Sequence, residues 1–227
     1  MFRKPAVRIL LVLSLLTVAG IVALASAGHH GIVTSQDGRM SIAKQGPSHI
    51  TAFHQPAGLT VIAGNLSKYP NGVFFCCYGY TISGPDSFLS SAYWVAIPFT
   101  PTSNMTVNEV EVSVGWGGDG TNGVTLSVNA DASGLPGTAL ASLDVTGLSD
   151  YGQCCQLVVA KSPKGLPVNQ GTQYWVVVST DTSTENTFDA WAFNSTDMRS
   201  YPFASYSTAN GWVNSDGLLP GYAVLGQ

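Results

Sequence analysis

The four cysteines carry the clearest chemistry, and they occur as two adjacent pairs, Cys76–Cys77 and Cys154–Cys155. An even number of cysteines indicates disulfide bonds in an exported chain, and the N-terminus of this chain predicts export. A bridge within one pair closes a strained eight-membered ring, so we expect bridges between the pairs, in either connectivity. Each would close about 78 residues and stabilise the fold by about 4–5 kcal/mol. A redox-active vicinal pair and a four-thiolate metal site are the alternatives, although zinc sites favour C-x₂₋₄-C spacing.

Catalysis would need a nucleophile beside a base, or two facing carboxylates. All four histidines precede the strand-rich part of the chain: His29, His30, His49 and His54. The sequence has no G-x-S-x-G, H-E-x-x-H or phosphate-binding glycine motif. Four carboxylates on or near predicted strands could serve glycan hydrolysis: Glu109, Glu111, Asp144 and Asp189. Because Glu109 and Glu111 alternate with apolar residues, we interpret them as a solvated face and expect no catalytic residue.

Metal binding has weaker candidates. Signal cleavage before Gly28 would free an amine two residues before His30, an arrangement that suits the square-planar geometry of Cu(II). The alternative is a polar tail that contains histidines. Two turn-rich segments offer oxygen ligands for calcium: Asp119 with Asn122, and Asp181 with Glu185 and Asp189. Neither has the spacing of a known calcium loop, and turns favour Asp and Asn for backbone reasons, so no cofactor is expected.

Aromatic side chains are abundant, with 5 Trp and 9 Tyr. Trp116 and Trp175 lie within alternating strand patterns and are expected in the core. Trp191 and Trp212 have polar neighbours such as Asn194. An exposed ring flanked by amides is typical of sugar sites in β-sandwiches. Trp191, Asn194 and Trp212 are therefore candidate ligand-binding residues, with core packing or loop anchoring as the alternative for each ring.

The N-terminus predicts export. Residues 1–27 have the features of a cleaved signal peptide: a basic start, an apolar run over residues 9–25 and the small residues Ala25-Ser26-Ala27. An uncleaved anchor helix is the alternative. Residues 28–58 are polar and weakly patterned, so we expect a flexible leader there and a folded domain over residues 59–227. We expect a secreted, extracellular protein, with the periplasm or cell surface as alternatives, and no membrane span after cleavage.

Charge restricts the partners of the mature chain. Only 10% of the residues are charged, and residues 28–227 carry 6 basic and 13 acidic side chains. This balance argues against nucleic acids and anionic membranes as partners.

From Leu59 onward the chain consists of short alternating segments separated by Gly, Pro, Asn, Asp and Ser. Val110–Trp116 and Val124–Ala130 flank a glycine-rich turn and are predicted to form a β-hairpin with one buried face. Further strands are predicted at residues 92–99, 141–145, 156–160, 173–179, 188–193 and 222–225. No segment has a sustained helical period. The pattern predicts an all-β fold, an antiparallel, jelly-roll-like β-sandwich.

Four of these segments occur in an order that resembles a known family: Tyr93–Pro101, Val124–Leu140, Gly171–Ser179 and Ala190–Asn194. Over most of residues 60–227 the chain is similar to the exported bacterial β-sandwich modules called choice-of-anchor domains. The resemblance implies a surface or secreted sandwich with no established catalytic activity. Such modules often precede a C-terminal anchoring signal, which this sequence lacks, so the resemblance does not imply attachment to the cell.

Together these patterns favour an exported, non-catalytic β-sandwich that acts as a structural or binding module at the cell surface or in the extracellular matrix. Other surface proteins are the partners expected of the structural role. A carbohydrate-binding module is the alternative, with extracellular polysaccharide as its partner. A carboxylate-dependent glycan hydrolase or lyase comes third, and would show two carboxylates that face each other in a cleft.

Overall fold

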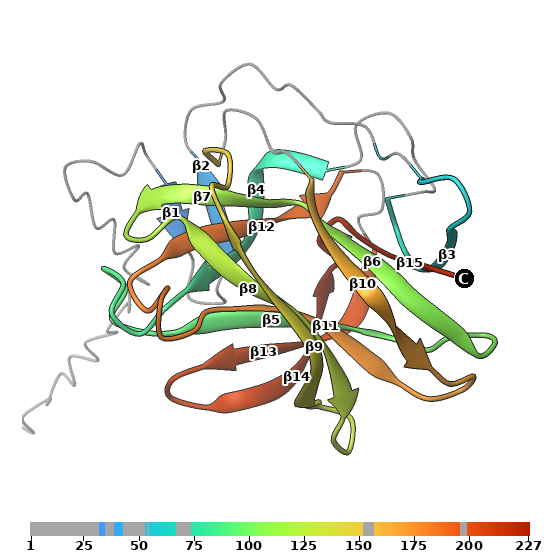
Figure 1. Ribbon diagram of the computed structural model, residues 1–227. Coiled ribbons are helices and arrows are strands. Elements are labelled where there is room, and N and C mark those ends of the chain that lie inside the picture. The colour runs from blue at the N-terminus through green and yellow to red at the C-terminus, as the bar shows by residue number, and fades with distance from the viewer. Residues whose placement is uncertain are drawn as a thin grey trace, which may run out of the picture.

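The computed structural model describes residues 32–34, 39–42, 53, 55–66, 74–151, 157–195 and 199–227. These residues form strands and turns without a helix, and the strands assemble into two antiparallel sheets (Figure 1). The predicted all-β, antiparallel sandwich is therefore confirmed. A search of the described part of the chain for a helix able to cross a membrane finds none.

Eleven of the described strands belong to the larger sheet, whose central path runs β1-β2-β4-β5-β11-β8-β9. Off this path, β12 joins β4 and β7, while β13 joins β5 and carries β14. The bounds are β1 Ile32–Thr34, β2 Arg39–Ile42, β4 Phe74–Ser83, β5 Tyr93–Phe99, β7 Val114–Asp119, β8 Gly123–Asp131, β9 Pro136–Thr146, β11 Tyr174–Ser179, β12 Phe188–Asn194, β13 Ser200–Ser207 and β14 Gly211–Leu218.

The smaller sheet has the order β10-β6-β15-β3. Its strands are β3 Thr60–Gly64, β6 Met105–Val112, β10 Val158–Val168 and β15 Tyr222–Gly226. The strand β15 lies between β6 and β3, so the last strand in the sequence is an inner strand of this sheet (Figure 1).

The main core lies where the two sheets face each other. Val110 and Val112 of β6 and Val224 of β15 belong to the same buried cluster as Leu126 and Val128 of β8. These residues alternate with others along their strands, because successive side chains of a strand point to opposite faces. A second cluster covers the outer side of the smaller sheet and includes Ala223 and Leu225 of β15.

Most of the predicted strands are present. Residues 92–99, 173–179, 188–193 and 222–225 correspond to β5, β11, β12 and β15, and residues 141–145 lie within the longer β9. Residues 158–160 of the predicted strand 156–160 open β10. The sequence analysis did not predict β3, β4, β13 or β14. Two further strands, β1 and β2, fall within the predicted leader, and β2 pairs with β4.

The predicted hairpin between Val110–Trp116 and Val124–Ala130 is wrong. The first segment is divided between β6 in the smaller sheet and β7 in the larger, while β8 pairs with β9 and β11. The chain crosses at Ser113, whose hydroxyl donates to the carbonyls of Ala192 (2.9 Å) and Gly221 (3.2 Å). Because the alternation of apolar residues continues across the crossing, the sequence pattern could not separate one strand from two.

Candidate functional site

Two of the three residues expected to contact a ligand are buried. Trp191 and Asn194 are both 0% exposed, because β12 is enclosed between β4 and β7 and its seven residues are all buried. The Trp191 indole Nε1 donates to the carbonyl of Gly221 (2.9 Å), and the Asn194 amide donates to the carbonyl of Asn65 (3.2 Å). The expectation of an exposed ring at Trp191 is therefore wrong, and both side chains hold the core together.

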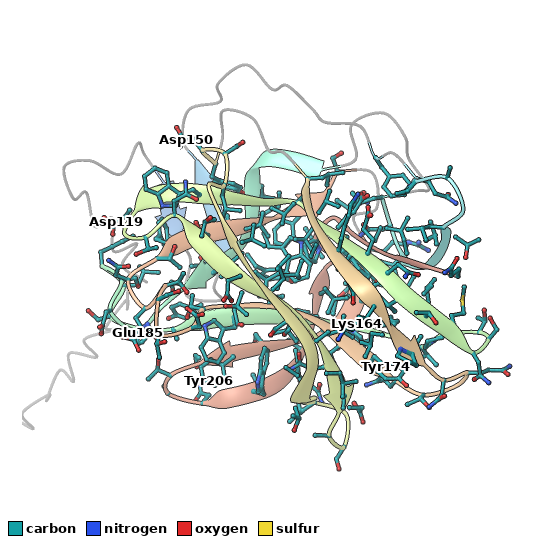
Figure 2. All side chains as sticks on the ribbon, in the orientation of Figure 1. Asp119, Asp150, Lys164, Tyr174, Glu185 and Tyr206 are labelled. Atoms are coloured by element: carbon teal, nitrogen blue, oxygen red, sulfur yellow. The ribbon has the colours of Figure 1, made fainter. Side chains whose placement is uncertain are left out.

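The third residue, Trp212, lies in an aromatic group on the outer face of the larger sheet. Tyr206 is the cross-strand partner of both Trp94 and Trp212, so the three side chains share one face, and Figure 2 labels Tyr206 there. The Trp94 and Tyr206 rings stack with centroids 4.1 Å apart and an interplanar angle of 13°. Trp212 meets Tyr206 edge-on at 5.6 Å. We call these three half-buried residues the ring cluster.

A pocket lies at the hairpin that β13 and β14 form. Trp94 and Tyr206 of the ring cluster line it, together with residues that alternate with them along β5 and β13. It has a volume of about 340 Å³ and is bounded by β4, β5, β13 and β14. We call it the hairpin pocket. Its polar side chains are hydroxyls, one amide and one indole: Tyr80, Thr81, Ser91, Tyr93, Trp94, Ser205, Tyr206, Ser207, Asn210 and Ser215.

The hairpin pocket carries no charge. Among the described residues that line it there is no Asp, Glu, Lys, Arg or His. Tyr93 adds a half-buried aromatic ring. Neutral donors and acceptors beside an aromatic ring suit a neutral ligand that is rich in hydroxyl groups.

The carboxylates on β6 do not form a solvated face, which corrects the sequence interpretation. Glu109 and Glu111 are 4% and 3% exposed. Their partners in β15 are Leu225 and Ala223, members of the apolar cluster that covers this outer side of the smaller sheet. Glu109 Oε2 lies 3.5 Å from Lys161 Nζ. Burial, together with a hydrogen bond to Glu109, raises the pKa of Glu111 to about 8. The Glu111 carboxyl therefore holds its proton near neutral pH.

Asp181, Glu185 and Asp189 have three different environments. The Ser183 hydroxyl and backbone N–H donate to Asp181 Oδ1 (2.7 and 2.8 Å), which lowers the pKa of Asp181. Glu185 is exposed, whereas Asp189 is 0% exposed and lies 2.8 Å from the Thr187 hydroxyl. Burial raises the pKa of Asp189 well above its usual range. These acids are not assembled into a cation site: in the described part of the chain, no three His, Cys, Asp or Glu side chains form a metal-binding group.

The other calcium candidates lie at one end of the sandwich (Figure 2 labels Asp119). The Asn122 side chain is occupied by the backbone of Leu148: its amide donates to the Leu148 carbonyl (2.9 Å) and its Oδ1 accepts from the Leu148 N–H (2.6 Å). The Trp116 indole donates to the backbone carbonyl of Asp119 (3.1 Å). Asn122 therefore joins its own loop to the loop that contains Leu148, which is a backbone role typical of Asn in turns.

Replacing Asn122 with alanine is expected to lower the free energy of unfolding by about 2 kcal/mol. The change leaves both backbone groups of Leu148, a residue that is 6% exposed, without their partners. Urea denaturation measures this loss. Asn214→Ala, at an exposed position on β14, is the control, and an equal effect of the two changes would contradict the role given to Asn122.

The remaining predicted site residues lie outside what the structure describes. His30 and the Cys154–Cys155 pair fall in undescribed segments. Cys76 and Cys77 belong to β4, where the structure describes the backbone but not their side chains. Disulfide bonds and copper binding at Gly28 stay predictions.

The sequence analysis missed the residues of the hairpin pocket. Ser205, Ser207 and Ser215 are small polar residues on β13 and β14, and their types carry no signal for a ligand site. The usable signal was the alternation in Ser200–Ser207, where Tyr201 and Phe203 share a face with Ser205.

Comparisons of the chain with protein-family models, with curated proteins and with solved structures find no match. The resemblance to choice-of-anchor domains therefore stays an expectation from sequence.

Proposed function

We propose that this chain is an exported, non-catalytic β-sandwich module of the cell surface or extracellular matrix, and that it binds a neutral glycan in the hairpin pocket. The observation that carries the proposal is the lining of this pocket. Hydroxyl groups, one amide, the Trp94 indole and the rings of Tyr80, Tyr93 and Tyr206 surround about 340 Å³ without a charged side chain.

A glycan fits this chemistry better than other ligand classes. Hydroxyl and amide groups can both donate and accept hydrogen bonds, as sugar hydroxyls do, and an aromatic ring can pack on the apolar face of a pyranose. A charged ligand would meet no counter-ion in the pocket. The excess of acidic over basic residues in 28–227 further disfavours anionic polysaccharides.

A binding role is favoured over catalysis because the close pair of carboxyls lies elsewhere. Glu109 and Glu111 are buried on the outer side of the smaller sheet, and neither lines the hairpin pocket. Glycoside hydrolysis needs two carboxyl groups on either side of the scissile bond.

The test is retention of residues 28–227 on a panel of insoluble neutral polysaccharides, with and without EDTA. Ser215→Trp places a large ring at the pocket and is expected to reduce retention at least tenfold. Asn214→Trp is the matched control, because it places the same ring on the opposite, exposed face of β14 and should leave retention within twofold.

Trp212→Ala separates the pocket from the outer face. We expect this variant to bind like the wild type, because Trp212 does not line the hairpin pocket, although its neighbours Trp94 and Tyr206 do. Retention lost on Trp212→Ala but kept by Ser215→Trp would contradict the pocket as the binding site. A wild-type protein that binds no polysaccharide would overturn the glycan proposal and leave the structural role.

A further inference from the structure

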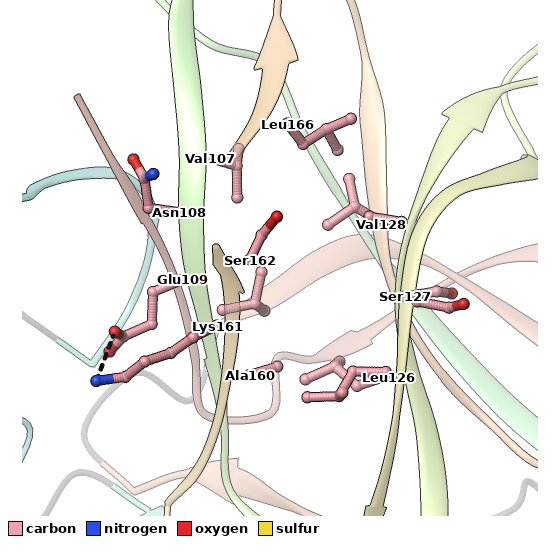
Figure 3. A pocket seen from close by; sticks show the side chains of 14 residues that line it. Val107, Asn108, Glu109, Leu126, Ser127, Val128, Ala160, Lys161, Ser162 and Leu166 are labelled. Atoms are coloured by element: carbon pink, nitrogen blue, oxygen red, sulfur yellow. Dashed lines mark ion pairs between the residues drawn. The ribbon is translucent and has the colours of Figure 1, made fainter. Parts of the chain in front are cut away.

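A second cavity lies between the two sheets, away from the hairpin pocket. It has a volume of about 220 Å³ and opens where β9 and β10 approach each other (Figure 3). In the described structure β9 pairs with β8 and β10 pairs with β6, so no ladder of hydrogen bonds joins the strands on either side of the opening. We call it the inter-sheet cavity.

The walls of the inter-sheet cavity are mainly hydrocarbon. Val107 of β6, Leu126 and Val128 of β8, and Ala160 and Leu166 of β10 line it (Figure 3). The four larger residues pack in the main core of the sandwich, where interiors normally leave few voids larger than a water molecule. Water in such a space would find few hydrogen-bond partners, because an apolar cavity gives it none.

The backbone of β10 is irregular on this side of the sandwich. The pairing of β10 with β6 is interrupted between Lys161 and Leu166. Gly165 has φ +68° there, and a Cβ added to it would lie 2.2 Å from Thr106 Cγ2. The interruption moves the second half of β10 out of register with the first on β6.

One charged pair, Lys161 and Glu109, is among the lining residues, but the two side chains point away from Leu126 and Val128. The Lys161 and Glu109 side chains lie on the far side of their strands and are joined to each other (3.5 Å; Figure 3). The other polar side chains of the lining are the Asn108 amide and the hydroxyls of Ser127, Ser142 and Ser162. Because Lys161 and Glu109 pair with each other, the rim offers hydrogen bonds to a neutral head group and no unpaired charge to a carboxylate or an amine.

We propose that the inter-sheet cavity binds the hydrocarbon part of a neutral amphiphile, a group of about six to ten carbon atoms. A dry apolar cavity of about 150 Å³ holds benzene, and drug-sized pockets begin near 300 Å³. The volume of the inter-sheet cavity lies between these two values. The group enters between β9 and β10 and leaves its hydroxyl or ester end at the serine rim. This site is independent of the proposed glycan function.

The test is titration of the full chain with octan-1-ol, followed by methyl NMR. We expect saturable shifts of the Val107, Val128 and Leu166 methyl groups, whereas those of Val159, a 43% exposed residue that points outward from β10, stay unchanged. Ala160→Phe fills the cavity and is expected to weaken binding at least tenfold. Val159→Phe, one residue earlier on the opposite face, is the matched control and should stay within twofold of the wild type.

A second titration, with neutral phosphatidylcholine vesicles, distinguishes a free amphiphile from the acyl chain of a lipid. Binding of octan-1-ol without vesicle binding assigns the site to free molecules, and vesicle binding that Ala160→Phe abolishes assigns it to lipid chains. If Ala160→Phe does not fold, Ala160→Leu replaces it. The proposal is overturned if the wild type shows no saturable methyl shifts, or if the filled variant binds octan-1-ol as tightly as the wild type.

Discussion

Replacing Trp191 with alanine is expected to lower the free energy of unfolding by about 4 kcal/mol, the range measured when large buried aromatic residues are truncated. The side chain is 0% exposed and is among the largest fully buried ones in the described structure. Its removal leaves a cavity in the main core and deprives the Gly221 carbonyl of the indole N–H.

Trp212→Ala is the matched comparison, because the same atoms are removed from a half-buried position in the ring cluster. We expect it to cost about 1–2 kcal/mol, since part of the ring is already in contact with water. Urea denaturation of both variants at one pH gives the two values. Equal losses would contradict the different positions of the two rings.

Replacing Glu111 with glutamine is expected to stabilise the protein at alkaline pH. The pKa of Glu111 is raised from 4.5 to about 8 in the folded state, so between these values the folded chain holds a proton that the unfolded chain has released. The wild type therefore loses stability as pH rises through this window, by about 1.4 kcal/mol per pH unit at most. Glutamine is neutral throughout and can still donate a hydrogen bond to Glu109.

We expect Glu111→Gln to exceed the wild type by about 2–4 kcal/mol at pH 8 and to differ little from it at pH 4.5. Urea denaturation at several pH values between 4.5 and 8.5 measures the difference. Asp144→Asn, an exposed carboxylate on β9, is the control and should keep the slope of the wild type. Parallel curves for Glu111→Gln and the wild type would show that Glu111 is not the protonated group.

The sequence predicted the fold class because the strands that form the inner walls of the sandwich have strong patterns. The apolar run Tyr174–Ser179 and the alternating patterns in β8 and β15 could be recognised as strands without knowing which strands pair with them. The pairing of the strands could not be predicted in the same way, because it depends on contacts between segments that are distant in the sequence. Ser113 has the size and polarity of any strand residue, and only its bonds to Ala192 and Gly221 show that the chain changes sheets there.

The predictions about the site residues were wrong for the same reason. Glu109 and Glu111 alternate with valines as surface residues do, but a second apolar cluster covers the face that the pattern assigned to water. Polar neighbours in the sequence made Trp191 resemble a surface ring, although β4 and β7 enclose its strand. The serines of the hairpin pocket become recognisable only when β13 and β14 lie beside β4 and β5.

The position of β15 also sets an order of events in biosynthesis. Its partner β3 is the first strand of the smaller sheet to be synthesised. The Thr60 hydroxyl of β3 nevertheless donates a hydrogen bond to the carbonyl of Gly226, 166 residues later. Contacts of such long range form late, because the chain must first close a very large loop. On a ribosome, the smaller sheet therefore stays incomplete until Gly226 has emerged. A nascent chain in this state lacks part of the main core, because Val224 of β15 belongs to it.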